Sequence, residues 1–213
     1  KEADSAAVVG DDEILSYAKS RVAALNRKYG EKFCLFVRKR TYCSGEKKFM
    51  GWERKRGAVL ELVRYLKGLA GVKRMTGLEC RAGTDTLLKD TRYVLTLDAD
   101  TDLTIGAVRE MVSVFLHPLN KPEIDRERGK VVAGYAILQP KMSTALAASR
   151  LTGFTRLLAG VSGNDIYASA AYDIPMNLFG EGIFCGKGMF DIDAFYELLD
   201  GAFPEETVLS HDF

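Results

Sequence analysis

The pattern of apolar and polar residues along the chain switches between a helical and an extended period. Apolar residues recur at helical spacing in three long runs, of which the first ends on Gly30 and the third stops before Pro118. We therefore expect helices over 14–29, 52–69 and 104–117. Short runs of large apolar and β-branched residues predict strands over 32–38, 93–97 and 131–140.

The remaining segments give weaker signals. The sequence predicts a helix over 143–160, kinked near Gly153, and a short helix over about 192–200. CSGEKK (43–48) reads as a polar turn and NKPEIDRERGK (120–130) as a charged surface loop. The stretch 71–90 is predicted to be loop with one short strand.

Strands that alternate with helices predict one fold class. They indicate an α/β domain with a Rossmann-like, mostly parallel sheet flanked by helices, and the 213 residues suit a single domain. Ligands of such folds gather at the carboxyl ends of the strands. The run YVLTLDADT (93–101) places Asp98 and Asp100 at such an end.

Composition and charge exclude several classes of function. Lysine plus arginine (30) nearly balances aspartate plus glutamate (29), which gives no overall electrostatic reason to bind nucleic acid. No apolar run reaches the roughly 18 residues of a membrane span, and no signal-peptide pattern opens the chain, so we expect a soluble, cytosolic segment. Four cysteines without a CxxC pair, and only two histidines, predict reduced thiols and no zinc site.

Two closely spaced carboxylates at the end of a buried strand need a partner, because like charges repel and a buried unpaired charge is costly. Alternation places Asp98 and Asp100 on the same side, where a magnesium ion bound to a substrate diphosphate is the simplest partner. One alternative is that Asp100 or Thr101 caps the following helix. Another is an aspartyl nucleophile of the haloacid-dehalogenase type, which is less favoured because position 102 is aspartate.

Six stretches together resemble the glycosyltransferase domain of cyclic β-1,2-glucan synthases, which is related to processive inverting transferases such as cellulose synthase. The stretches are MGWERKRGAVLEL (50–62), YVLTLDADT (93–101), HPLNKP (117–122), GYAILQPK (134–141), LFGEGIFCGKGMFDIDAF (178–195) and PEETVLSHDF (204–213). The resemblance implies a GT-A type fold, UDP-glucose as donor, Mg²⁺ or Mn²⁺ as cofactor and a glucan acceptor. It also implies that the chain is part of a larger multidomain membrane enzyme working at the cytoplasmic face of the inner membrane.

The resemblance implies which residues bind the donor. Lys55, Arg56 and Gly57 match a basic segment near the nucleotide diphosphate in related transferases, although a solvated basic face is the structural alternative. Asp98 and Asp100 match the DxD motif, with Asp100 assigned first as a direct metal ligand and Asp98 as a contact to ribose or metal. The metal would offset the charge that develops on departing UDP.

The acceptor side is assigned by the same resemblance. Its candidates are Gln139, Glu181, Gly182, Phe184, Cys185 and Gly186. Gln139 resembles the edge of the acceptor channel, and the FCG triplet resembles a segment at the acceptor terminus in cellulose synthase. A tight turn with a buried Cys185 is the alternative for this triplet.

The segment SHD (210–212) stands where related enzymes have Thr-Glu-Asp, whose aspartate is the general base. Asp212 is therefore the candidate base, and His211 either orients it or shuttles the proton itself. Since a free aspartate has a pKa of about 3.9, a dry pocket would have to raise it. An inverting single displacement needs no covalent intermediate.

The resemblance also suggests that the chain is an incomplete domain. It lacks the early strands and the closing segment of the family's domain, so we expect weak nucleotide binding and little turnover from the chain alone. A degenerate sugar-nucleotide-binding or scaffold domain without catalysis is the alternative function.

Overall fold

The computed structural model describes residues 2–69, 71, 77–140, 152–154, 178, 184 and 186–204. Their contacts group the chain into two compact units, Lys1–Val94 with Asp191–Phe213 and Leu95–Phe190. The expectation of a single domain stays a prediction. No helix within these described ranges is both long enough and apolar enough to cross a membrane.

The first unit opens with helix α1 (Asp11–Tyr29), which confirms the first predicted helix. Its first turn carries three acidic residues and its last turn two basic ones, and both arrangements suit the helix dipole. The helix ends at Gly30, whose φ of 82° favours glycine. Asn26 is buried and fixes the exit, because its side-chain amide donates to the Phe33 carbonyl and accepts from the backbone N–H groups of Lys32 and Phe33.

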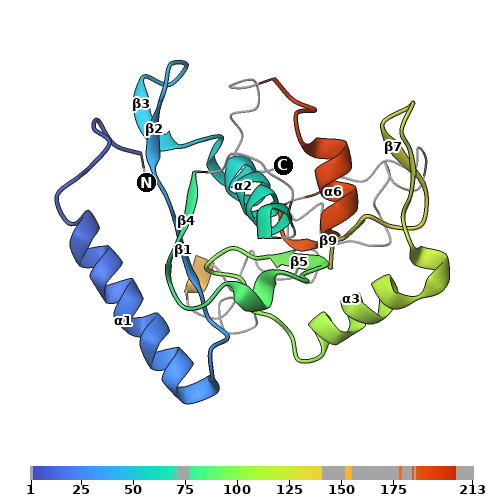
Figure 1. Cartoon of the computed structure of the whole chain (residues 1–213), viewed down its shortest axis with the longest axis horizontal. Coiled ribbons are helices and arrows are strands. Elements are labelled where there is room, and N and C mark those ends of the chain that lie inside the picture. The colour runs from blue at the N-terminus through green and yellow to red at the C-terminus, as the bar shows by residue number, and fades with distance from the viewer. Residues whose placement is uncertain are drawn as a thin grey trace. The chain divides into compact units, whose positions relative to one another are not determined.

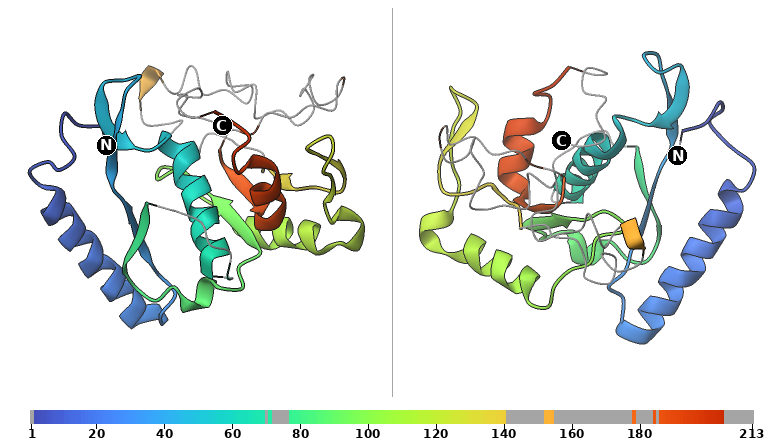
Figure 2. Two further views of the ribbon diagram at one scale, coloured as in Figure 1. Left: turned by 45° about the horizontal axis from the view of Figure 1, so that its top comes forward. Right: turned by 180° about the vertical axis from the view of Figure 1, so that it is seen from behind.

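Strands β1 (Leu35–Arg38) and β4 (Leu78–Ala82) form an antiparallel pair in this unit, and α1 lies along it (Figures 1 and 2). Strands β2 (Arg40–Cys43) and β3 (Lys48–Gly51) form an antiparallel hairpin around the predicted polar turn. Figure 1 shows this hairpin projecting beyond β1 and β4. A short 3₁₀ helix, η1 (Thr86–Leu88), follows β4.

Helix α2 (Arg54–Leu69) packs on α6 (Ile192–Leu199), and the two lie near each other in both figures. The buried apolar side chains of the two helices include Val59, Leu60, Val63, Leu66, Ile192 and Phe195. Each such side chain contributes about 1.5–3 kcal/mol through burial, so this helix pair anchors the unit. Asp191 caps α6, because its carboxylate accepts from the N–H groups of Asp193 and Ala194.

The second unit contains helix α3 (Ala107–Leu116), which buries Met111 and Phe115 and stops before Pro118 as predicted. A 3₁₀ turn, η2 (Pro118–Asn120), leads into the antiparallel hairpin of β6 (Glu123–Asp125) and β7 (Lys130–Ala133). A three-stranded sheet has the order β5-β9-β8, from β5 (Tyr93–Thr96), β9 (Gly188–Asp191) and β8 (Ile137–Leu138). The boundary between the units falls within β5 and after Phe190 in β9.

The mixed α/β class is confirmed, but the expected mostly parallel sheet is not found among the described residues. The strands form four small sheets, and β1–β4, β2–β3, β6–β7 and β8–β9 are all antiparallel. Strands β5 and β9 also run in opposite directions. The Ile192 N–H donates to the Arg92 carbonyl at one end of this pair, and the Thr96 hydroxyl donates to the Gly188 carbonyl at the other.

Two local predictions were wrong. The charged segment 120–130 is not all loop, because it forms most of the β6–β7 hairpin. The single strand predicted over 131–140 is interrupted at Gly134, which has φ of 71° and no room for a side chain, since a Cβ there would lie 2.1 Å from the Lys121 carbonyl oxygen. The kinked helix predicted over 143–160 lies outside the described residues, apart from 152–154.

Candidate functional site

The chain leaves β5 at Thr96 and turns at the two aspartates. The Thr101 N–H donates to the Asp98 carbonyl over 3.1 Å, which closes a turn across Asp98–Thr101. The strand alternation that predicted both carboxylates on one side therefore does not continue through them. Asp98 is half-buried, whereas Asp100 is exposed.

The helix-cap alternative for Asp100 and Thr101 is wrong. Helix α3 begins only at Ala107, and Gly106 with φ of 92° stands at its N-cap without a side-chain cap. The two aspartates thus lie in a loop between β5 and α3, and binding residues are often carried on loops that a rigid scaffold positions.

Asp98 is paired with a cation that the sequence reasoning missed. The Lys187 ammonium lies 2.9 Å from Asp98 Oδ2, and the two side chains are 24% and 32% exposed. Lys187 stands directly before β9, so the pairing of β5 with β9 brings it to the end of β5. The sequence signal was the segment Gly-Lys-Gly at 186–188, a charged residue between two glycines inside an otherwise apolar stretch.

The Gly-Lys-Gly segment is tightly held. Gly186 is buried with φ of 73°, a conformation that favours glycine. A Cβ on Gly188 would lie 2.5 Å from the Leu138 carbonyl oxygen, 2.8 Å from the Phe184 ring and 3.3 Å from Gln139 Cα. The backbone on both sides of the lysine is therefore closely constrained.

These contacts bring several predicted site residues together within the second unit. Asp98 was assigned to the donor, whereas Gln139, Phe184 and Gly186 were assigned to the acceptor. All four lie around the short segment that carries Lys187. Residues assigned to the donor and to the acceptor, which are distant in the sequence, thus lie near the same short segment.

The two aspartates after β5 supply oxygen ligands, which hard divalent cations prefer. Asp98 and Asp100 offer carboxylate oxygens, and magnesium typically takes one or two carboxylates with water and phosphate oxygens completing its shell. The described part of the chain contains no group of three or more histidine, cysteine, aspartate or glutamate side chains that could hold a metal ion.

The second predicted donor segment, Lys55–Gly57, lies in the other unit at the first turn of α2. Glu53 and Arg54 enter this turn with φ of 51° and 48°, and the Gly57 N–H donates to the Glu53 carbonyl over 2.9 Å. A Cβ on Gly57 would lie only 1.9 Å from the Trp52 carbonyl oxygen. Glycine is thus required at 57 by the tightness of the turn itself.

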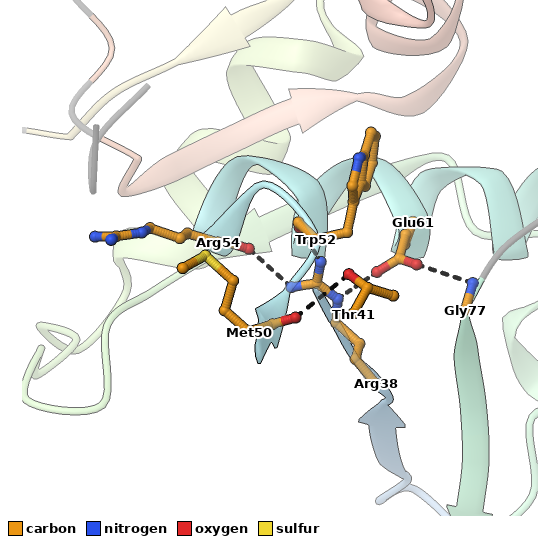
Figure 3. A network of polar contacts seen from close by, with 7 residues as sticks. All are labelled: Arg38, Thr41, Met50, Trp52, Arg54, Glu61 and Gly77. Atoms are coloured by element: carbon orange, nitrogen blue, oxygen red, sulfur yellow. Dashed lines mark hydrogen bonds and ion pairs between the residues drawn. The ribbon is translucent and has the colours of Figure 1, made fainter. Parts of the chain in front are cut away.

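Arg38 holds this turn from below, as Figure 3 shows. Its guanidinium donates to the carbonyls of Trp52 and Arg54, the latter over 2.8 Å, and to the Glu61 carboxylate. The other oxygen of Glu61 accepts from the Gly77 N–H over 2.8 Å. Arg38 and Glu61 are only 15% and 9% exposed, so this buried pair fixes the start of α2 against β1 and β4.

Arg56 is less available to a ligand than the sequence suggested. Its side chain is 8% exposed, its Nη2 lies 2.7 Å from the Glu53 carboxylate, and its guanidinium lies 5.5 Å from the centre of the Phe203 ring. Arg56 Nε is buried without a hydrogen-bond acceptor among the described residues. A solvated basic face, the alternative to donor binding, is therefore wrong for Arg56, whereas Lys55 is half-buried.

A separate polar cluster lies where β1 and β4 meet α2. The Tyr65 hydroxyl donates to the Asp85 carboxylate, and the Cys34 thiol to the Thr84 carbonyl over 3.1 Å. Burial, with a smaller contribution from Asp85, raises the pKa of the Tyr65 phenol well above its ordinary value. Burial and the neighbouring Cys80 raise the pKa of the Cys34 thiol. Cys34, Cys43 and Cys80, the cysteines within the described ranges, are unbridged.

Five predicted site residues lie outside the described residues: Glu181, Gly182, Cys185, His211 and Asp212. Their assignments stay predictions that rest on the resemblance.

The family resemblance is confirmed by comparison with known proteins. The chain is 36% identical over 207 residues to cyclic beta-(1,2)-glucan synthase NdvB of Rhizobium meliloti (strain 1021). The match covers 95% of this chain and 7% of that protein, so the chain corresponds to a small segment of a much longer relative. No protein-family profile matches the chain.

Proposed function

We propose that the chain is a catalytic segment of a glycosyltransferase that transfers glucose from UDP-glucose to a growing β-1,2-glucan with inversion. The observation that carries this proposal is the similarity to a glucan synthase over 95% of the chain. The carboxylates after β5, next to residues assigned to the acceptor, support it. The GT-A architecture that the resemblance implies stays part of the proposal.

The donor end of the proposed site uses Asp98 and Asp100. These carboxylates hold Mg²⁺ or Mn²⁺ together with the diphosphate of UDP-glucose, and the metal, when bound, offsets the negative charge of the departing UDP. Lys55, Arg56 and Gly57 are proposed as further donor contacts. Arg56 already pairs with Glu53, so a diphosphate contact by Arg56 would compete with that ion pair.

The acceptor end of the proposed site deprotonates a glucan hydroxyl. Asp212 is proposed as the general base, with His211 orienting it or passing on the proton. The hydroxyl attacks the face of the glucose opposite UDP, so an α-linked donor gives a β-linked product in one displacement. Gln139, Phe184 and Gly186 are proposed to border the acceptor, together with Glu181, Gly182 and Cys185.

The protein that contains this chain is proposed to be a larger membrane enzyme that acts at the cytoplasmic face of the inner membrane. The small share of the relative that the chain covers supports a larger assembly of domains. A sugar-nucleotide-binding scaffold without catalysis is the competing function.

Incorporation of labelled glucose from UDP-glucose into glucan by the natural full-length protein tests the proposal. We expect Asp100→Asn and Asp212→Asn each to reduce incorporation by at least about 100-fold, a typical loss for a general base or a charge-stabilising group. Asp102→Asn, in the same loop as Asp100, is the matched control and should retain activity. Unchanged incorporation in all three variants would favour the scaffold.

A further inference from the structure

We propose that Lys187 contacts the diphosphate of the sugar-nucleotide donor, and that donor binding moves its ammonium away from Asp98. This inference rests on the proposed function and adds a residue to its donor site. The observation behind it is the 2.9 Å ion pair between Lys187 Nζ and Asp98 Oδ2.

The pairing of β5 with β9 fixes the position of this ion pair. The Thr96 hydroxyl donates to the Gly188 carbonyl over 3.2 Å, which fastens the end of β5 to the start of β9 one residue after Lys187. Gly186 takes a conformation that favours glycine, and Gly188 has no room for a Cβ. The backbone at Lys187 therefore has little conformational freedom, and its ammonium lies next to the Asp98 carboxylate.

A divalent cation at Asp98 and Asp100 would change the partner of this ammonium. The Lys187 ammonium lies 2.9 Å from Asp98 Oδ2, so a cation bound by the same carboxylate would compete with it. The two like charges would repel each other. A lysine ammonium sits on a flexible four-carbon stem and carries three donors, which lets it move to a new acceptor without moving the backbone. A diphosphate bound together with that metal would offer the ammonium a phosphate oxygen as a new acceptor, and lysine binds phosphate as a point charge.

Removal of the Lys187 ammonium is expected to change metal binding and UDP binding in opposite directions. Without the ammonium, Asp98 loses its competitor, so a metal ion alone should bind more tightly. Without the ammonium, the diphosphate loses one charge-assisted contact, so UDP in the presence of metal should bind more weakly. Uridine, which has no phosphate, should not respond. A residue that only stabilised the sheet would not separate these three ligands.

The test uses Lys187→Met in the natural full-length protein, with Lys187→Arg as the charge-preserving variant. Lys130→Met is the control, because Lys130 is an exposed lysine in the same unit. Mn²⁺ binding is measured by electron paramagnetic resonance, and binding of UDP and of uridine by calorimetry with excess Mn²⁺. Circular dichroism establishes that each variant is folded.

We expect Lys187→Met to tighten Mn²⁺ binding about threefold or more and to weaken UDP binding about tenfold or more, the usual effect of losing a charged hydrogen bond. Lys187→Arg should restore most of the UDP affinity, and Lys130→Met should change nothing. UDP binding that is normal in Lys187→Met would overturn the role of Lys187 and leave the proposed function standing. If the unsubstituted protein fails to bind UDP, the proposed function fails and this inference fails with it.

Discussion

The buried pair of Arg38 and Glu61 gives the sharpest test of how the fold positions the Lys55–Gly57 segment. The substitution Glu61→Leu keeps a side chain of similar volume but removes the carboxylate that the Arg38 guanidinium and the Gly77 N–H both use. Arg38 would then carry a charge in a site where its side chain is only 15% exposed.

The expected cost follows from this burial. Breaking a buried ion pair by removing one partner typically costs about 3–5 kcal/mol, because the remaining charge is left uncompensated. For a chain of this size, 1 kcal/mol moves the melting temperature by roughly 2–4 °C, so the midpoint should fall by roughly 6–20 °C. The double variant Arg38→Met/Glu61→Leu should recover part of this loss, since it removes both charges.

Urea denaturation followed by circular dichroism measures the loss as a change in the free energy of unfolding. Glu79→Leu is the matched control, because Glu79 pairs with Lys39 on an exposed surface and should have little effect. A Glu61→Leu variant that unfolds at the same urea concentration as the unsubstituted protein, with an unchanged slope, would show that the ion pair does not stabilise the fold. The same conclusion would follow if the double variant lost more free energy of unfolding than the two single substitutions lose together.

Three further predictions concern the first unit. Gly57→Ala should destabilise the fold by about 1–3 kcal/mol in urea denaturation, because the new methyl group would meet the Trp52 carbonyl, whereas Gly68→Ala in the same helix has open space and should be neutral or stabilising. The pKa of Tyr65 in the folded protein is raised, so this phenol should not ionise between pH 9 and 11, and Tyr65→Phe should leave the absorbance change at 295 nm over that range almost unaltered. For the same reason the contribution of Tyr65 to stability is complete below the ordinary pKa of about 10 and is lost as the pH rises above it. Cys34 should react with iodoacetamide at pH 8 more slowly than a free thiol, because its raised pKa leaves less thiolate; mass spectrometry that finds it alkylated at the rate of free cysteine would contradict this.

The helices were predictable because their signals are local. The apolar periodicity and Gly30 gave α1, and the same periodicity gave α2 and the position of α6. The end of β5 at the aspartates was also predictable, since a short apolar run stops there. These features depend on residues a few positions apart, which a reader of the sequence sees together.

The strand pairings were not predictable, because they depend on contacts between distant segments. The β2–β3 hairpin was read as a turn alone, since its strands include charged residues such as Arg40 and Lys48 that the strand pattern disfavours. Gly134 interrupts a strand that looked continuous, because the Lys121 carbonyl packs against it. The alternation of strands and helices suggested parallel pairing, but direction is set by the connections and not by the alternation itself.

The candidate site was predictable in part. The acidic pair stood out by its position after a strand, whereas its partner Lys187 lies far along the chain and only the β5–β9 pairing brings it near. Arg56 looked like a ligand contact in a basic run, yet its guanidinium is used within the fold. Sequence spacing reports which residues are neighbours along a helix or strand, but not which charges are already neutralised.

Calorimetry of UDP binding by the natural full-length protein, with Mg²⁺ and again with a chelator, shows whether Asp98 and Asp100 hold a metal-bound nucleotide diphosphate. We expect UDP binding to weaken at least about tenfold when Mg²⁺ is removed or when either aspartate becomes asparagine, while Asp102→Asn binds normally. Equal UDP affinity with and without Mg²⁺, and in both aspartate variants, would contradict it.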